Sequence, residues 1–145
     1  MKVRVGVEEQ PARDASEKTT ASVAARVLVV DDEESVRLSV ARVLRKSGYE
    51  VMTACDGSEA LAVMSGEDPV ELILMDVTMP VMDGSVAARE LRGRGVLIPI
   101  VLMSGYAEEE LVNRGVLAHV DGFLKKPFEV TELLAAVRDR LAQLV

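Results

Sequence analysis

The stretch VELILMDVTMPVMDG, at residues 70–84, combines a buried strand with the loop that follows it. Its first six residues are nearly all apolar, and a short apolar run of this kind is typical of a strand buried on both faces. Asp76 stands directly at the end of the run. Pro80 and the pair Asp83-Gly84 then predict a loop before the next helix. This stretch therefore indicates one unit of a parallel sheet with a carboxylate at its edge.

The same alternation continues on both sides of this stretch. The strands are predicted at residues 26–30, 49–54, 70–75, 98–103 and 122–125. The first helix is predicted to stop at Gly48 and to have these apolar residues on its inner face: Val36, Val40, Val43 and Leu44. The other four helices are predicted at residues 58–64, 85–91, 108–114 and 129–143. Five strands that alternate with five helices predict an α/β fold with a parallel sheet, right-handed crossovers and helices on both faces.

The first 25 residues differ from the rest in composition. Residues 8–25 are rich in Glu, Ala, Ser and Thr and contain no aromatic residue, which predicts a flexible leader or linker. We therefore expect the folded domain at residues 26–145. The chain ends soon after its last predicted helix and has no segment like a DNA-binding helix-turn-helix, so no output domain is expected.

The net charge of −7 argues against a nucleic-acid surface, which would show a basic patch. Residues 1–25 carry four basic and four acidic side chains, so the whole excess belongs to the predicted domain, where it suits a divalent cation or a basic partner. The one cysteine, Cys55, is expected to be a small buried residue. No apolar run approaches the roughly 20 residues of a membrane span, and the N-terminus lacks a signal-peptide core. A cytoplasmic protein is predicted.

Polar side chains stand at the ends of four predicted strands. Asp31 and Asp32 follow the first strand, Asp76 the third, Ser104 the fourth, and Lys126 lies just beyond the fifth. Because the carboxyl ends of parallel strands meet at one edge of the sheet, these groups are expected to converge.

Three adjacent carboxylates repel one another unless a cation lies between them, and Mg²⁺ prefers one or two carboxylates together with phosphate oxygens and water. One carboxylate then remains available as a nucleophile that would form an aspartyl phosphate. A hydroxyl and an ammonium group are suited to contact the phosphoryl oxygens.

Four motifs in this order resemble the receiver domain of two-component response regulators. They are VLVVDDE at residues 27–33, LILMDVTMPVMDG at 72–84, VLMSGYA at 101–107 and KPF at 126–128. The resemblance covers residues 26–143 and implies a flavodoxin-like, doubly wound sheet of strand order 2-1-3-4-5. The segment MSGYA at residues 103–107 is similar to receivers attached to hybrid histidine kinases, which implies a phosphorelay or phosphate-sink role.

The resemblance also assigns roles at the site. It implies that Asp76 is the phosphoacceptor and that Asp31, Asp32, Asp76 and the backbone carbonyl of Thr78 hold Mg²⁺, with Mn²⁺ as an alternative ion. Lys126 would pair with the phosphoryl oxygens, and the Lys126-Pro127 bond is expected to be cis.

Two further groups of residues would act after phosphorylation. Ser104 would be the switch hydroxyl and Phe123 the aromatic residue that turns inward with it. Thr78 and Tyr106 would tune the lifetime of the phosphoryl group, and our hypothesis is that the Tyr106 ring shields it from water.

A receiver of this kind implies a sensor histidine kinase or a histidine phosphotransfer protein as phosphodonor. It also implies an unidentified downstream protein that binds the face of the fourth helix, fifth strand and fifth helix, and no contact with nucleic acid or membrane. The chain is expected to be a monomer or a weak homodimer through that face. Apolar residues of the last helix could form a dimer seam, although packing within the chain also explains them: Leu134, Val137, Leu141 and Leu144.

Several alternatives remain at this stage. Asp31 and Asp32 could cap the first helix, and Asp76 could be a turn residue or a cap. A magnesium-dependent phosphatase of the haloacid-dehalogenase type would also use an aspartyl phosphate, but Thr78 stands where such enzymes have a second Asp. A phosphorylation-independent scaffold with the same fold would lack part of the acidic pair, acceptor and lysine, and none is missing. We therefore expect a signalling protein and not an enzyme.

Overall fold

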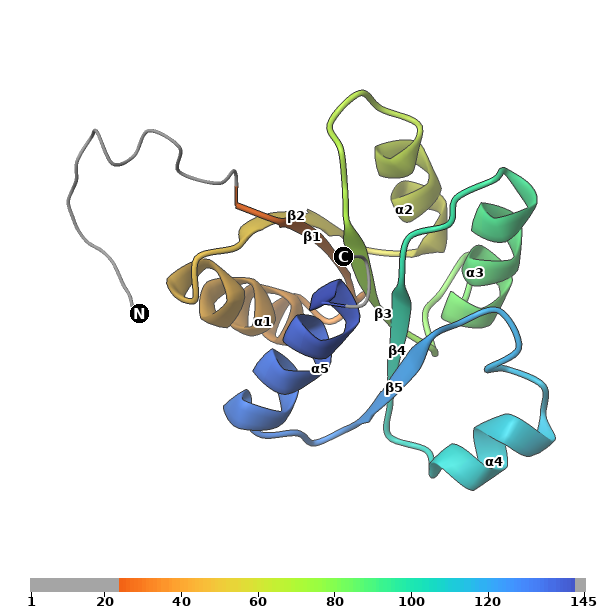
Figure 1. Cartoon of the computed structure of the whole chain (residues 1–145). Helices are drawn as coiled ribbons and strands as arrows, with labels where there is room; N and C mark the ends of the chain where they lie inside the picture. Colours follow the sequence, from red (N-terminus) through yellow and green to blue (C-terminus); the bar gives the residue numbers. More distant parts are fainter. Residues whose placement is uncertain (1–23, 143–145) are drawn as a thin grey trace, which may run out of the picture.

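The computed structural model describes residues 24–142 as five strands that alternate with five helices (Figure 1). The elements are β1 (Arg26–Val30), α1 (Glu34–Lys46), β2 (Glu50–Ala54), α2 (Gly57–Met64), β3 (Leu72–Asp76), α3 (Gly84–Gly93), β4 (Ile100–Ser104), α4 (Glu108–Asn113), β5 (Gly122–Lys125) and α5 (Val130–Ala142). Every predicted element is present, with bounds that differ by no more than two residues. The predicted leader, apart from its last two residues, and Leu144 of the predicted seam lie outside the described residues.

The strands form one parallel sheet in the order β2-β1-β3-β4-β5, as predicted. Helices α1 and α5 cover one face of the sheet, and α2, α3 and α4 cover the other (Figure 1). Because all strands run in the same direction, their carboxyl ends lie along a single edge. The sites predicted at the strand ends are thus gathered on that edge.

Alternate residues of the strands supply two apolar layers. In β1, Val27 and Val29 face the layer under α1 and α5, whereas Leu28 and Val30 face the layer under α2, α3 and α4. Strands β3 and β4 are buried throughout. In α5, Val137 is fully buried and Leu134 and Leu141 pack against the same layer, so packing within the chain accounts for these three residues of the predicted seam.

One arginine ties together the loops at the opposite edge of the sheet. Arg92 of α3 donates hydrogen bonds to the carbonyls of Val96, Ile98 and His119 at 2.9, 2.8 and 3.0 Å. It also pairs with Asp121 at 2.7 Å. The loops before β4 and β5 are thereby held to the end of α3. None of the helices between residues 24 and 142 has the length and apolarity needed to cross a bilayer.

Candidate functional site

The structure brings the predicted strand-end residues together at the carboxyl edge of the three central strands and β5. Asp31 follows β1, Asp76 ends β3, Ser104 ends β4, and Lys126 follows β5. Asp31, Asp76 and Ser104 are buried, whereas Asp32 is exposed. Buried polar groups of this kind need partners, so the contacts among them show how the site is built.

Lys126 links two of the carboxylates. Its Nζ atom lies 2.9 Å from Asp31 Oδ2 and 3.3 Å from Asp76 Oδ1. The amide of Lys126 donates to the Ser104 carbonyl at 2.8 Å, so the β4–β5 pairing continues to the site and fixes where the side chain starts. The Lys126-Pro127 peptide bond is cis, as predicted. The lysine is therefore held by main-chain contacts on one side and by two carboxylates on the other.

Burial and neighbouring charges shift the protonation of Asp76 and of Lys126. Burial raises the pKa of Asp76 to about 6; the negative charges of Asp31 and Asp32 act in the same direction, and Lys126 opposes them. For Lys126, burial lowers the pKa, but the hydrogen bond to Asp31 and the charges of Asp76 and Asp31 outweigh it. The pKa of Lys126 is therefore raised. The single ammonium group does not fully offset the negative charge around Asp76.

This arrangement fits a divalent cation. One oxygen from each of Asp31, Asp32 and Asp76 can be chosen so that all three lie within 4.8 Å of one another. Three ionised carboxylates and one ammonium leave a net charge of about −2 by simple count, and hard oxygen donors are the ligands that Mg²⁺ selects. Thr78, the source of the fourth predicted ligand, is exposed two residues after Asp76. The residues present thus fit the predicted ion.

The loop after β3 is tightly constructed. Gly84 donates from its amide to the Val77 carbonyl at 2.7 Å, and a Cβ atom at position 84 would collide with the backbone of Asp76. Asp83 caps α3 by accepting from the Val86 amide at 3.0 Å. The cap of α3 is therefore Asp83, and the reading of Asp76 as a cap is wrong.

A strained turn lies in the middle of the same loop. Val81 has a φ of 69°, and the amide of Met82 donates to the Pro80 carbonyl at 2.7 Å, the hydrogen bond of a γ-turn. The Met82 carbonyl then accepts from the amide of Gly57 at 3.2 Å, which joins the loop to the start of α2. A positive φ is unfavourable for a β-branched residue, so surrounding contacts must maintain this turn.

The loop after β1 is held differently. Asp31 Oδ1 accepts from the Glu33 amide at 2.9 Å, and the guanidinium of Arg37 donates to the Asp31 carbonyl at 2.8 Å. The N-cap of α1 is Glu33, which makes no side-chain capping bond. The alternative in which Asp31 and Asp32 cap α1 is therefore wrong. Arg37 was missed from the sequence because nothing separates it there from the other basic residues of α1.

Ser104 and Tyr106 are linked at the end of β4. The Tyr106 amide donates to Ser104 Oγ at 3.0 Å. Tyr106 is 43% exposed, and its ring stacks against Arg114, whose Cζ lies 5.1 Å from the ring centroid. Arg114 also pairs with Glu110 at 2.9 Å. The ring is thus held against the C-cap residue of α4. Phe123 is half-buried against the apolar layer that α2, α3 and α4 cover.

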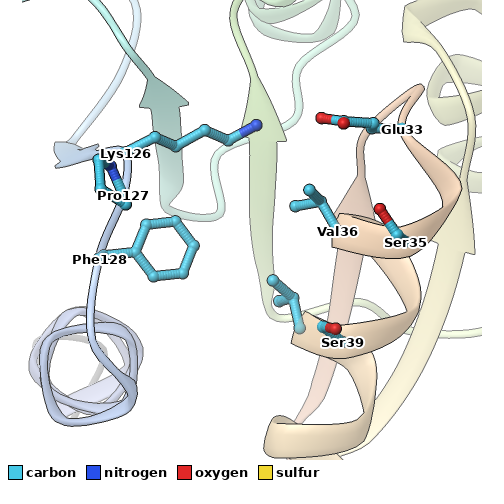
Figure 2. Close-up of a pocket in the computed structure, with 8 residues that line it drawn as sticks. Glu33, Ser35, Val36, Ser39, Lys126, Pro127 and Phe128 are labelled. Carbon is cyan, nitrogen blue, oxygen red and sulfur yellow. The ribbon is translucent and has the colours of Figure 1, made fainter.

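An open groove of about 540 Å³ borders the site between α1 and the connection from β5 to α5. Figure 2 shows Lys126 reaching across this groove toward Glu33, with Phe128 and Val36 facing each other below. The groove keeps one flank of the site accessible from solvent.

Cys55 is exposed just after β2, so the expectation that it is buried was wrong.

Comparisons with known proteins agree with this geometry. The sequence matches the response regulator receiver domain family over residues 27–138. It is 37% identical to the sensor kinase CckA of Brucella abortus (strain 2308), over 93% of this chain and 15% of that protein. It is 44% identical to the response regulator MprA of Mycobacterium tuberculosis (strain ATCC 25177 / H37Ra), over 78% of this chain and 49% of that protein. The chain thus spans half or less of these relatives.

A solved structure shows the same fold. The response regulator TrrA of Thermotoga maritima, in complex with Mg²⁺ and BeF, superposes with a TM-score of 0.71. It is 32% identical in sequence, and the match covers 79% of this chain and 97% of that one. The four motifs, the strand order and the family match agree: this chain belongs to the response regulator receiver domain family, whose members are phospho-accepting domains of two-component signalling systems that interact with histidine kinases or phosphotransfer proteins.

Proposed function

We propose that Asp76 of this chain accepts a phosphoryl group from a phosphohistidine in a reaction that requires a divalent cation. The observation that carries the proposal is the position of Lys126, whose ammonium lies within 3.3 Å of Asp76 and 2.9 Å of Asp31. An ammonium at this position can stabilise charge on the oxygens of a phosphoryl group bound to Asp76.

The transfer would proceed in line. A carboxylate oxygen of Asp76 attacks phosphorus and forms the C–O–P linkage, while the P–N bond to the donor imidazole breaks and the nitrogen keeps the electron pair. Lys126 and the Ser104 hydroxyl contact the phosphoryl oxygens as charge spreads over them. In the later hydrolysis, water attacks phosphorus, inorganic phosphate is released and the Asp76 carboxylate is restored.

Asp31, Asp32, Asp76 and the backbone carbonyl of Thr78 would hold the cation. When bound, Mg²⁺ or Mn²⁺ would neutralise the repulsion among these carboxylates and the incoming phosphoryl oxygens. The clustered carboxylate oxygens support this assignment. The structure of the TrrA relative with Mg²⁺ and BeF supports the same class of ion for this chain.

Phosphorylation would be communicated through Ser104 and Phe123. A hydrogen bond from Ser104 to a phosphoryl oxygen would draw it away from the Tyr106 amide that it now accepts from, and the half-buried Phe123 would follow. A few kcal/mol of bias between two packings is enough for such a switch. The face of α4, β5 and α5 would then change its affinity for the downstream protein, and Thr78 and Tyr106 would tune how long the signal lasts.

The proposal also includes the phosphodonor, the domain bounds, the location and the oligomeric state. The donor would be a sensor histidine kinase or a histidine phosphotransfer protein, and a phosphorelay role is supported by the similarity to the CckA kinase. The receiver domain would span residues 26–145 after a linker at 1–25. The chain would act in the cytoplasm as a monomer or a weak homodimer through the face of α4, β5 and α5, without nucleic-acid or membrane contacts and without enzymatic turnover of its own.

Intact mass spectrometry after incubation with acetyl phosphate tests the proposal. With Mg²⁺, the wild type should gain one phosphoryl group, whereas Asp76→Ala should gain none. Asp68→Asn, which changes an exposed loop carboxylate, should behave like the wild type. A gain without Mg²⁺, a gain in Asp76→Ala, or no gain in any protein would each contradict the proposal. Steady turnover of a phosphate monoester such as p-nitrophenyl phosphate would instead indicate a phosphatase.

A further inference from the structure

Arg37 of α1 makes hydrogen bonds on both sides of Asp32. Its guanidinium donates to the Asp31 carbonyl at 2.8 Å, and its backbone amide donates to the Glu33 carbonyl at 2.9 Å. These two carbonyls flank the exposed acidic residue of the candidate cation site. The arginine is half-buried, although its charge would be hydrated more readily on the outer surface of the helix.

The helix itself cannot supply the first of these bonds. Helix α1 starts at Glu34, so the Asp31 carbonyl lies before the residues whose carbonyls accept intrahelical bonds. The amide of Asp31, which belongs to the preceding peptide, donates to the Ala54 carbonyl at 3.1 Å and so anchors the chain up to Asp31. Beyond that point, the Arg37 guanidinium restrains the peptide plane between Asp31 and Asp32, because rotation of that peptide would break its hydrogen bond.

The side chain of Asp31 is constrained from the other direction. One of its oxygens accepts from the Lys126 ammonium and the other from the Glu33 amide. These contacts orient the carboxylate of Asp31, and the bond from the Glu33 amide also restrains the peptide that follows Asp32. The direction of Asp32 is therefore set by the backbone on both sides of it. The backbone in turn is held by Arg37.

We propose that Arg37 is a positioning residue for the acidic pair: it holds the peptide between Asp31 and Asp32 in the orientation that lets both carboxylates share one cation. The inference rests on the proposed cation site. Arg37 contacts the main chain and is not one of the proposed cation ligands, so its effect would be transmitted through Asp32.

The direction in which removal of Arg37 changes the affinity for the cation distinguishes a positioning role from a purely electrostatic one. A guanidinium close to the acidic pair repels a cation, so its removal should strengthen cation binding if charge were its main effect. If Arg37 positions Asp32, its removal should weaken binding, because the ion must then order the loop. One hydrogen bond to a buried carbonyl corresponds to a weakening of about three- to tenfold.

Isothermal titration calorimetry of the full chain with MgCl₂ at constant ionic strength would measure this effect. Arg37→Met should raise the Kd for Mg²⁺ about three- to tenfold. Arg37→Lys, which keeps the charge and a donor, should fall between Arg37→Met and the wild type. Arg42→Met removes an exposed charge from the same helix and should leave the Kd within about twofold.

Circular dichroism and thermal unfolding without metal would establish that each variant is folded; if Arg37→Met is not, Arg37→Lys and Arg37→Gln carry the test. A Kd that is unchanged or lower in the Arg37 variants would overturn the positioning role while leaving the cation site intact. If the wild type binds no Mg²⁺, the proposed function itself fails together with this inference. The two failures are therefore distinguishable.

Discussion

The charge on Asp76 should cost folding stability when no cation is present. Its pKa is raised from 3.8 to about 6, chiefly by burial and then by the charge of Asp31. Each unit of pKa corresponds to about 1.4 kcal/mol, so the shift corresponds to ~3 kcal/mol before discount. Because solvent reaches part of the carboxyl group, we reduce this to about 2 kcal/mol. Asp76→Asn removes the charge and keeps the shape, and should therefore stabilise the metal-free protein.

The pH dependence of this gain has a definite sign. A raised pKa in the folded state means that the native protein binds the proton more tightly than the unfolded chain does. Below pH 3.8 the carboxyl is protonated in both states and contributes no penalty. Between pH 3.8 and about 6 the unfolded chain ionises first, so stability falls as pH rises, and the full cost is present above about 6.

Urea and thermal unfolding in EDTA at pH 4.0 and pH 7.5 would measure the difference. At pH 7.5, Asp76→Asn should exceed the wild type by about 2 kcal/mol, roughly 5–10 °C in Tm for a domain of this size. At pH 4.0 the two should nearly coincide, and Asp68→Asn should match the wild type at both pH values. Added Mg²⁺ should stabilise the wild type more than the variant and so narrow the gap. Equal stabilities at pH 7.5, or the same gap at both pH values, would refute the electrostatic account of the site.

Three further predictions concern the loops around the site. Val81→Gly should stabilise the protein by about 1 kcal/mol in urea unfolding, because the strain energy of the positive φ exceeds the free-energy cost of the extra freedom that glycine gives the unfolded chain. Val81 is 82% exposed, so little packing is lost, and a lower stability of the variant would show that Val81 is not strained. Arg92→Met should lower the free energy of unfolding by about 2–3 kcal/mol, because it leaves carbonyls of the loops before β4 and β5 without their donor. Arg94→Met, at an exposed position, should lower it by under about 0.5 kcal/mol, and equal effects would show that Arg92 does not hold the two loops together. Tyr106→Ala should speed the hydrolysis of the acyl phosphate if the ring shields it from water. An unchanged rate would mean that the ring does not shield it, in agreement with the contact between the ring and Arg114.

The strand ends could be predicted from the sequence because each one is marked by an abrupt change from apolar to polar residues. Asp31, Asp76 and Ser104 each follow a run of apolar residues, and a parallel sheet brings such positions to one edge whatever the details of packing. Strand order came from the resemblance to the family and not from the apolar pattern. Pairing between strands depends on tertiary contacts that the pattern does not encode.

Other features could not be predicted from the sequence because they depend on where a side chain or a peptide plane points. Arg37 lies among several basic residues of α1, and only the fold shows that its guanidinium returns to the Asp31 carbonyl. The positive φ of Val81 is hidden because nothing about valine predicts it. Cys55 was expected to be buried because cysteines usually are, but it follows the edge strand β2, in which Ala54 alone is buried.

The surroundings of the three carboxylates support Asp76 as the nucleophile without reference to any motif. Asp31 is fully buried and both of its oxygens already accept hydrogen bonds, so an attack on phosphorus would break existing contacts. Asp32 is exposed, and hydration stabilises its charge and lowers its reactivity. Asp76 ends β3 with its Oδ1 3.3 Å from Lys126 Nζ, so a phosphoryl group transferred to it would lie beside the ammonium that can stabilise its charge. The hydrogen bonds of Asp31 and the hydration of Asp32 therefore leave Asp76 as the carboxylate that would attack phosphorus when the cation is bound.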